Sequence, residues 1–328
     1  MDVILTDAQK QDIMVLNDIC NIYFDCNKEK QFSVQIARSN YINEMSYGSF
    51  VYVLAEEYGG IITNVITSTA LDYVECKGAT CRGMLNTKII QPNEGTDYYI
   101  VNGDVYDVMR EIIADQYDDL IRVKSGNLGV SVLNYRFDRY CTFLKGITKM
   151  LESEGYKLII KVIRNNEEAP FFELSASEIV DYSGDIDFTN DNEIHFTMED
   201  DRGGYNHIIG LGKGELRDRQ VVHKYIDADG KISDQQYYFG INEVVYLYDF
   251  SSGETETFER DVENKLLELM SKPTMSMDVL KYNPVSKIGD IVGGVDYLTG
   301  LKNARKIDNI VYSVEDGVES VDYELEGE

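Results

Sequence analysis

The chain alternates apolar and polar residues in many short runs. Residues 32–38 read FSVQIAR, and the run that starts at Ser49, SFVYVLAEE, repeats the alternation before Gly59 and Gly60 break it. A period of two is typical of a strand with one buried face. Further runs follow at short spacing, which is the rhythm of a small antiparallel barrel. We therefore predict a first β-barrel domain over residues 1–102.

The pattern changes to a helical period after Gly103. Asp104 can cap a helix whose apolar residues share one face, namely Val105, Val108, Met109, Ile112 and Ile113. A second helix is expected to begin at Asp138 and to end at Gly155, a residue suited to a left-handed C-terminal position. Two further strands, YKLIIKVIR and PFFELSA, follow it. These elements predict an α/β insert domain over residues 103–176.

Short strand patterns return beyond Asp181 and continue to the last residues. They are rich in β-branched and aromatic side chains and are separated by Gly, Asp and Asn. One helix is expected within them over residues 258–271, with Pro273 just past its end. We predict a second β-barrel domain over residues 177–328. The expected fold class is mainly β (α+β), with two β-barrel domains and a smaller α/β domain between them.

Composition limits the possible partners. The 58 acidic and 31 basic residues give a net charge of −27, which repels phosphate backbones and anionic membrane surfaces. The first residues, MDVILTDAQK, lack the basic flank and apolar run of a signal peptide, and no run of about 18 apolar residues occurs. We therefore expect synthesis in the bacterial cytoplasm, no nucleic-acid binding by a basic face and no membrane insertion.

Cysteine and histidine offer little material for a catalytic or metal centre. The five cysteines have spacings that fit neither a zinc site nor a redox pair, so we interpret them as reduced, buried thiols: Cys20, Cys26, Cys76, Cys81 and Cys141. The three histidines are His195, His207 and His223. We expect no metal and no cofactor.

Two glycine-containing segments resemble ligand-binding loops. The run from Gly210 to Glu215, GLGKGE, could approach a phosphate, but its spacing fits neither common nucleotide motif and a strand follows it, so we interpret it as a bulge or tight turn. The segment from Asp227 to Gly230 resembles the start of a calcium loop. Lys231 and Ile232 occupy positions where that loop needs an oxygen ligand and a glycine, so we predict a hairpin turn.

Adjacent carboxylates could serve acid–base chemistry, but such pairs are expected by chance in so acidic a chain. They are Asp118 with Asp119, Glu167 with Glu168, and Asp200 with Asp201. The final 14 residues carry seven acids and no Lys or Arg, a composition typical of a solvated strand edge. His223 alternates with apolar neighbours in QVVHKY and is interpreted as a hydrogen-bonded strand residue.

Three groups of motifs, in order along most of the chain, resemble the siphovirus ReqiPepy-type tail proteins, a family related to phage baseplate hubs. The first is GATCRGML, residues 78–85, continued by KIIQP from Lys88. The second is IGLGKGEL, residues 209–216, with Arg219 and His223 after it. The third is IGDIVG, residues 288–293, with a Thr-Gly pair at 299–300.

The resemblance implies a structural subunit of tail-hub type, assembled as a homotrimer that joins a sixfold tail tube to a threefold central spike in the baseplate. Its implied partners are tail tube, spike, tape-measure and other baseplate proteins, with DNA only passing through the lumen of the virion or tail-like particle. It implies no catalytic residues and an architectural role for seven motif positions: Arg82, Gly83, Gly210, Gly212, Glu215, Arg219 and His223.

The resemblance is compatible with three kinds of parent particle: a phage, a bacteriocin or another contractile injection system. The alternative function is a carbohydrate- or receptor-binding tail module, which requires exposed aromatic platforms, and the 24 tyrosines leave it open. A third alternative, an enzyme that degrades cell-wall polymer, has no matching motif, so we expect no enzymatic activity.

Overall fold

The structure is a computed structural model with two compact units. Residues 1–197 and 276–328 form unit 1, and residues 198–275 form unit 2. The boundaries between the units fall within two paired strands, β13 (Ile194–Glu199) and β18 (Thr274–Val279). The residues described are 1–17, 19–165, 168–183, 194–199, 203–250, 257–271, 274–279, 286–295 and 298–326.

Unit 1 is built around a ten-stranded sheet that curls into a half-barrel. Its order is β19-β20-β3-β4-β7-β6-β5-β1-β2, with β21 paired to β20. Alternate residues of β4 are buried, as the period of two predicts. The strands are β1 (Val3–Thr6), β2 (Asp12–Val15), β3 (Cys20–Asp25), β4 (Gln31–Ala37), β5 (Phe50–Val53), β6 (Gly59–Thr67), β7 (Tyr73–Thr80), β19 (Ile291–Val295), β20 (Lys302–Glu315) and β21 (Val318–Leu325).

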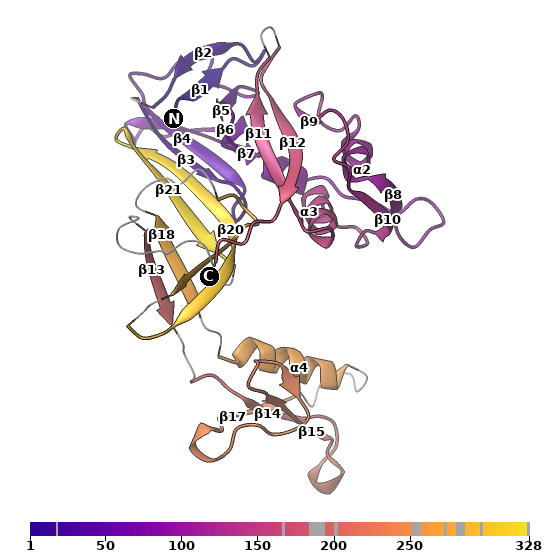
Figure 1. Cartoon of the computed structure of the whole chain (residues 1–328). Coiled ribbons are helices and arrows are strands. Elements are labelled where there is room, and N and C mark those ends of the chain that lie inside the picture. The colour runs from indigo at the N-terminus through magenta and orange to yellow at the C-terminus, as the bar shows by residue number, and fades with distance from the viewer. Residues whose placement is uncertain are drawn as a thin grey trace. The chain divides into compact units, whose positions relative to one another are not determined.

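The first and last strands of the chain share this sheet. Residues Val311–Val314 of β20 pair with β3 in antiparallel register, and Figure 1 shows the C-terminal hairpin of β20 and β21, in yellow, beside β3. The mainly β fold class is confirmed. The structure differs from the predicted division into three consecutive domains. Strands β19, β20 and β21 were expected in the second barrel, but they complete the sheet formed by the first seven strands.

An α/β region lies between these strands in sequence and packs against them in unit 1. Its strands form two small sheets, β10-β8 and β11-β12-β9. One buried cluster runs from Phe50 and Tyr52 of β5 through Leu85 to the helices and β11, so the α/β region shares a core with the curled sheet. The elements are α1 (Cys81–Asn86), β8 (Ile100–Asp104), α2 (Val105–Ile113), β9 (Ile121–Val123), β10 (Ser131–Arg136), α3 (Phe143–Ser153), β11 (Tyr156–Ile163) and β12 (Phe171–Glu178).

Two of the three expected helix boundaries in this region are confirmed. The Asp104 carboxylate accepts a hydrogen bond from the backbone N–H of Tyr106 and caps α2. Gly155 adopts φ +79° directly after Glu154, the C-cap residue of α3. The start of α3 was placed wrongly, because Thr142 caps it by accepting from the N–H of Lys145, whereas Asp138 pairs with Lys149.

Unit 2 is a four-stranded sheet with one helix on one face. The sheet order is β16-β15-β14-β17, in which β14 pairs antiparallel with β15 and parallel with β17. Helix α4 (Phe258–Leu269) corresponds to the helix expected over 258–271. The other elements are β14 (His207–Leu211), η2 (Leu216–Asp218), β15 (Val221–Ile226), β16 (Ile232–Ser233), η3 (Gly240–Asn242) and β17 (Val245–Asp249).

Across the described part of the chain, none of the helices has both the length and the apolar character that crossing a membrane requires.

Candidate functional site

The seven motif residues fall into two separate places. Arg82 and Gly83 lie in α1 of unit 1, and the remaining five lie in unit 2. In unit 1, Arg82 belongs to a group of charged residues around β11, which we call the β11 junction: Glu56, Glu57, Arg82, Lys157, Lys287 and Asp290. Four segments distant in sequence contribute to this group.

Helix α1 fixes the buried guanidinium of Arg82. The Thr80 hydroxyl accepts from the N–H of Gly83 and begins the helix. A Cβ at Gly83 would lie 2.3 Å from the Lys30 carbonyl oxygen, so only glycine allows this close approach. Arg82, 3% exposed, donates from Nε to Glu57 Oε1 at 2.5 Å and from Nη2 to the Leu158 carbonyl at 3.4 Å. Arg82 therefore joins the loop after β5 to β11.

The electrostatics of this pair favour the charged form. Burial acts to lower the pKa of Arg82, but the charge and hydrogen bond of Glu57 outweigh that effect and the pKa is raised. A guanidinium donates in a planar fork, which allows it to bind a carboxylate and a carbonyl at once. The expected architectural role of Arg82 agrees with these contacts.

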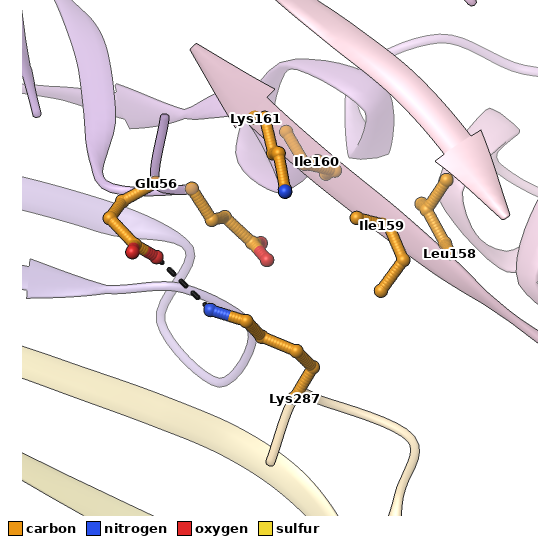
Figure 2. Close-up of a pocket in the computed structure, with 7 residues that line it drawn as sticks. Glu56, Leu158, Ile159, Ile160, Lys161 and Lys287 are labelled. Atoms are coloured by element: carbon orange, nitrogen blue, oxygen red, sulfur yellow. Dashed lines mark hydrogen bonds and ion pairs between the residues drawn. The ribbon is translucent and has the colours of Figure 1, made fainter. Parts of the chain in front are cut away.

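The loop that carries Glu56 and Glu57 pairs directly with β11. The Ala55 N–H donates to the Val162 carbonyl at 2.9 Å, and the Val162 N–H donates to the Glu56 carbonyl at 2.8 Å. Glu56 also forms an ion pair with Lys287 at 3.0 Å, drawn as a dashed line in Figure 2. These residues and part of β11 line a small pocket: Glu56, Glu57, Leu158, Ile159, Ile160, Lys161 and Lys287.

Asp290 and Lys157 form a second, more deeply buried ion pair of the junction. Asp290 Oδ1 also accepts from the Val180 N–H, and its Oδ2 accepts from the Lys287 N–H, both at 2.9 Å. Lys157 Nζ donates in addition to the Glu178 carbonyl at 2.9 Å. The hydrogen-bonding groups of both side chains are thus largely occupied, as buried charges require.

The neighbouring glycine explains part of the third motif. Gly289 adopts φ +98°, and a Cβ there would lie 2.9 Å from Lys157 Cβ. The IGDIVG segment therefore contains a turn that places the Asp290 carboxylate beside the Lys157 ammonium. The role of Asp290 does not follow from its motif, because no neighbouring residue indicates a partner 133 positions earlier in the chain.

In unit 2, Gly210 and Gly212 allow α4 to approach the sheet. A Cβ at Gly210 would lie 2.4 Å from Val262 Cγ2, and one at Gly212 would lie 3.1 Å from Phe258 Cε1. The core between sheet and helix consists of Ile208, Ile226, Phe258, Val262 and Leu266. The GLG sequence therefore provides close helix–sheet packing, which is one recognised use of glycine in a strand.

The turn after β14 is held by Arg219. Its Nε donates to the Gly212 carbonyl at 3.2 Å, and its Nη2 pairs with Asp249 Oδ1 at 2.8 Å. Gly214 adopts φ +102° in this turn. Glu215 is exposed and contributes a backbone carbonyl that accepts from the Asp218 N–H. The structure places a three-residue 3-10 turn here, which agrees with the tight turn expected from the sequence.

The Asp227–Gly230 segment is the hairpin turn that the sequence predicts. Asp227 Oδ1 accepts from the N–H groups of Asp229 and Lys231, each at 2.9 Å. Gly230 adopts φ +74° between β15 and β16. The Asp227 carboxylate is thereby engaged with the backbone of the turn.

His223 belongs to a hydrogen-bonded chain that sequence reasoning missed. His207 Nε2 lies 2.9 Å from His223 Nδ1, and His207 Nδ1 lies 2.8 Å from Glu243 Oε1. Tyr225 stacks on His207 with ring centroids 4.4 Å apart. The expectation of a hydrogen-bonded strand histidine is confirmed, but its partners follow from strand register, because Ile209 faces His223 and the two histidines are diagonal neighbours.

Among the described residues, the cysteine thiols and the adjacent carboxylates do not come together as a catalytic group. All five cysteines are unpaired and buried, as predicted, and burial raises the pKa of Cys20 to about 12, which keeps that thiol protonated at neutral pH. Glu168 pairs with Arg122. Within the described ranges no group of three His, Cys, Asp or Glu side chains could hold a metal ion. Glu167, Asp200, Asp201 and the side chain of His195 lie outside the described residues.

Comparison with known proteins links the fold to phage tails. No family model and no curated protein matches the sequence. The structure is similar to the 43 kDa tail protein of prophage MuSo2 from Shewanella oneidensis, with a TM-score of 0.52 at 10% identity over 99% of this chain and 98% of that one. The chain therefore shares its fold with a phage tail protein.

Two further structures show weaker similarity. One is the prophage tail protein gp18 from Listeria monocytogenes, with 15% identity over 100% of this chain and 95% of that one. The other is a tail protein from Neisseria meningitidis, with 12% identity over 99% and 95%. Each has a TM-score of 0.48.

Proposed function

We propose that this chain is a structural subunit of a phage tail or phage-tail-like particle, located in the baseplate hub. The observation that carries the proposal is the fold shared with a phage tail protein over 99% of this chain and 98% of the other. The resemblance of the three sequence motifs to hub-related tail proteins supports the same role independently of the fold.

In the proposed assembly three copies form a ring that joins the tail tube to the central spike. The partners are the tube, spike, tape-measure and other baseplate proteins, and DNA passes through the lumen without being held. The net charge of −27 supports this arrangement, because an acidic wall repels a polyanion. The acidic residues on one face of the C-terminal hairpin, such as Asp322 and Glu324 in β21, are the side chains proposed to face that lumen.

The role of the β11 junction is to keep the α/β region and the C-terminal hairpin in fixed relation within unit 1. Arg82 and Glu57 fasten the loop after β5 to β11, while Asp290 and Lys157 fasten β11 to the segment before β19. This proposal assigns the junction an architectural and not an enzymatic role.

The alternative is a carbohydrate- or receptor-binding tail module. Tyr237 and Phe239 support it, since they are 55% and 63% exposed and could serve as aromatic platforms. The two roles are separated by supplying an Arg82→Ala variant to a phage or particle-producing strain that lacks this gene. If the chain is a hub subunit, the variant should reduce the yield of complete particles. Normal particle yield with loss of host binding would favour the receptor-binding module.

A further inference from the structure

The sheet of unit 2 has an apolar face opposite α4, which we call the open face and define by Ile209, Leu211, Val221, His223, Val245 and Leu247. The register places these side chains in contiguous rows, since Ile209 pairs with both His223 and Leu247, and Leu211 pairs with Val221. Val221, Val245 and Leu247 are 48%, 43% and 61% exposed, whereas Ile208 on the opposite face is fully buried.

Helix α4 packs on one face of this mixed sheet, and the opposite face leaves Val221, Val245 and Leu247 exposed. Strand spacing gives the open face an area of roughly 300 Å², the size of the largest apolar patches on monomeric proteins, which are often functional. That area suits one amphipathic element and falls below the roughly 800 Å² that each partner of a stable dimer buries.

Hydrogen-bond chemistry defines what the partner must offer. When both imidazoles are neutral, the Glu243 carboxylate accepts from His207 Nδ1, and His207 Nε2 accepts from His223 Nδ1. His223 then keeps an acceptor lone pair on Nε2, an atom with no partner among the described residues. A partner on this face can donate a hydrogen bond at that point.

The negative charge of the chain also favours a partner that carries hydrogen-bond donors. Glu243 stands beside His207 just before β17, and Asp249 ends that strand in a pair with Arg219. The whole chain carries −27, so a basic partner is attracted.

We propose that the open face docks a basic amphipathic helix of a different protein. Its apolar side lies on Leu247, Val245 and Val221, and one lysine or arginine donates to His223 Nε2. This inference goes beyond the proposed hub function and stands on unit 2 alone, so it holds whether or not the chain forms a ring.

The test uses the full chain and a fluorescent 18-residue peptide of leucine and lysine, with leucines along one helical face. Fluorescence anisotropy should show binding that Leu247→Lys weakens at least tenfold. The matched control is Leu133→Lys, which adds the same charge at a leucine that is 82% exposed on β10 of unit 1, and it should change affinity less than twofold. Circular dichroism verifies that both variants are folded, and Leu247→Gln replaces Leu247→Lys if the latter is not.

Three results of the peptide assay would overturn the inference. They are absence of peptide binding, equal weakening by both lysine substitutions, and equal binding of a peptide in which glutamates replace the lysines. Sedimentation of the wild-type chain alone tests a second copy as the occupant. A dimer that Leu247→Lys dissociates would also contradict docking of a basic partner. Because no particle is involved, failure here leaves the hub proposal untouched.

Discussion

Lys157 and Asp290 form an ion pair across 133 positions of sequence, with their side chains only 6% and 1% exposed. The pair connects β11 of the α/β region to the segment that leads into β19. A buried ion pair seldom adds net stability relative to apolar residues of the same size, but removing one partner leaves a buried charge without compensation. The pair therefore fixes the position of the segment before β19 relative to β11.

The first prediction follows from that asymmetry. Asp290→Ala should lower the free energy of unfolding by about 3–5 kcal/mol, because it leaves the Lys157 ammonium buried and unpaired. Urea denaturation followed by circular dichroism measures the change. The double variant Lys157→Met with Asp290→Leu should be less destabilised than Asp290→Ala, because both lose the acceptors of the Val180 and Lys287 N–H groups but only Asp290→Ala leaves an unpaired buried charge. Equal losses in the two proteins would show that the charge pair is not the reason for the effect.

The second prediction concerns the contact between Gly210 and α4. Gly210→Ala should lower the free energy of unfolding of unit 2 by about 1–3 kcal/mol, because its Cβ would lie 2.4 Å from Val262 Cγ2. Adding Val262→Ala removes the clashing methyl groups, so the double variant should lose less than the sum of the single losses. Gly212→Ala, whose Cβ has 3.1 Å of clearance, is the milder control. Strict additivity would argue that α4 does not pack on Gly210.

The third prediction is a loss of stability at alkaline pH. Burial, reinforced by Cys76, raises the pKa of Cys20 from 9.0 to about 12, so the unfolded chain releases this proton at a lower pH than the folded one. The contribution of the protonated Cys20 thiol to the free energy of unfolding is present in full below pH 9. It decreases as the pH rises towards 12, by about 1.4 kcal/mol per pH unit.

Urea unfolding between pH 8 and 10.5, in the presence of a reductant, measures this slope. Cys20→Ala should be less stable than wild type at pH 8, because it leaves a cavity, yet its stability should fall less steeply with pH. Identical slopes for the two proteins would mean that Cys20 is not shielded from solvent in the folded state.

Features governed by neighbouring residues could be predicted from the sequence. The alternation in residues 32–38 identified β4, Asp104 was recognised as the cap of α2, and Gly155 was recognised as the left-handed residue after α3. Asp138 was misplaced as a helix start, since Thr142 lies close behind it and is an equally good capping residue. Local pattern does not distinguish two such candidates.

Features that depend on distant pairing could not be predicted in this way. The strand period indicates that Val311–Val314 form a strand, but not that they pair with β3 at the other end of the chain. The partners of His223 and Lys157 likewise follow from strand register and from the path of the chain. The architectural roles of Arg82, Gly210 and Arg219 agree with their contacts, whereas Glu215 contributes only backbone to its turn in the described structure.

The central claim, a structural subunit of the baseplate hub, is tested most directly by electron microscopy of the assembled particle with a label on this chain. The account predicts three copies of the 37.4 kDa chain in one ring at the end of the tail tube. It also predicts that β strands of both units contribute to the ring and that acidic side chains line its lumen. A peripheral position on the particle, or a threefold ring with a basic lumen, would contradict the account.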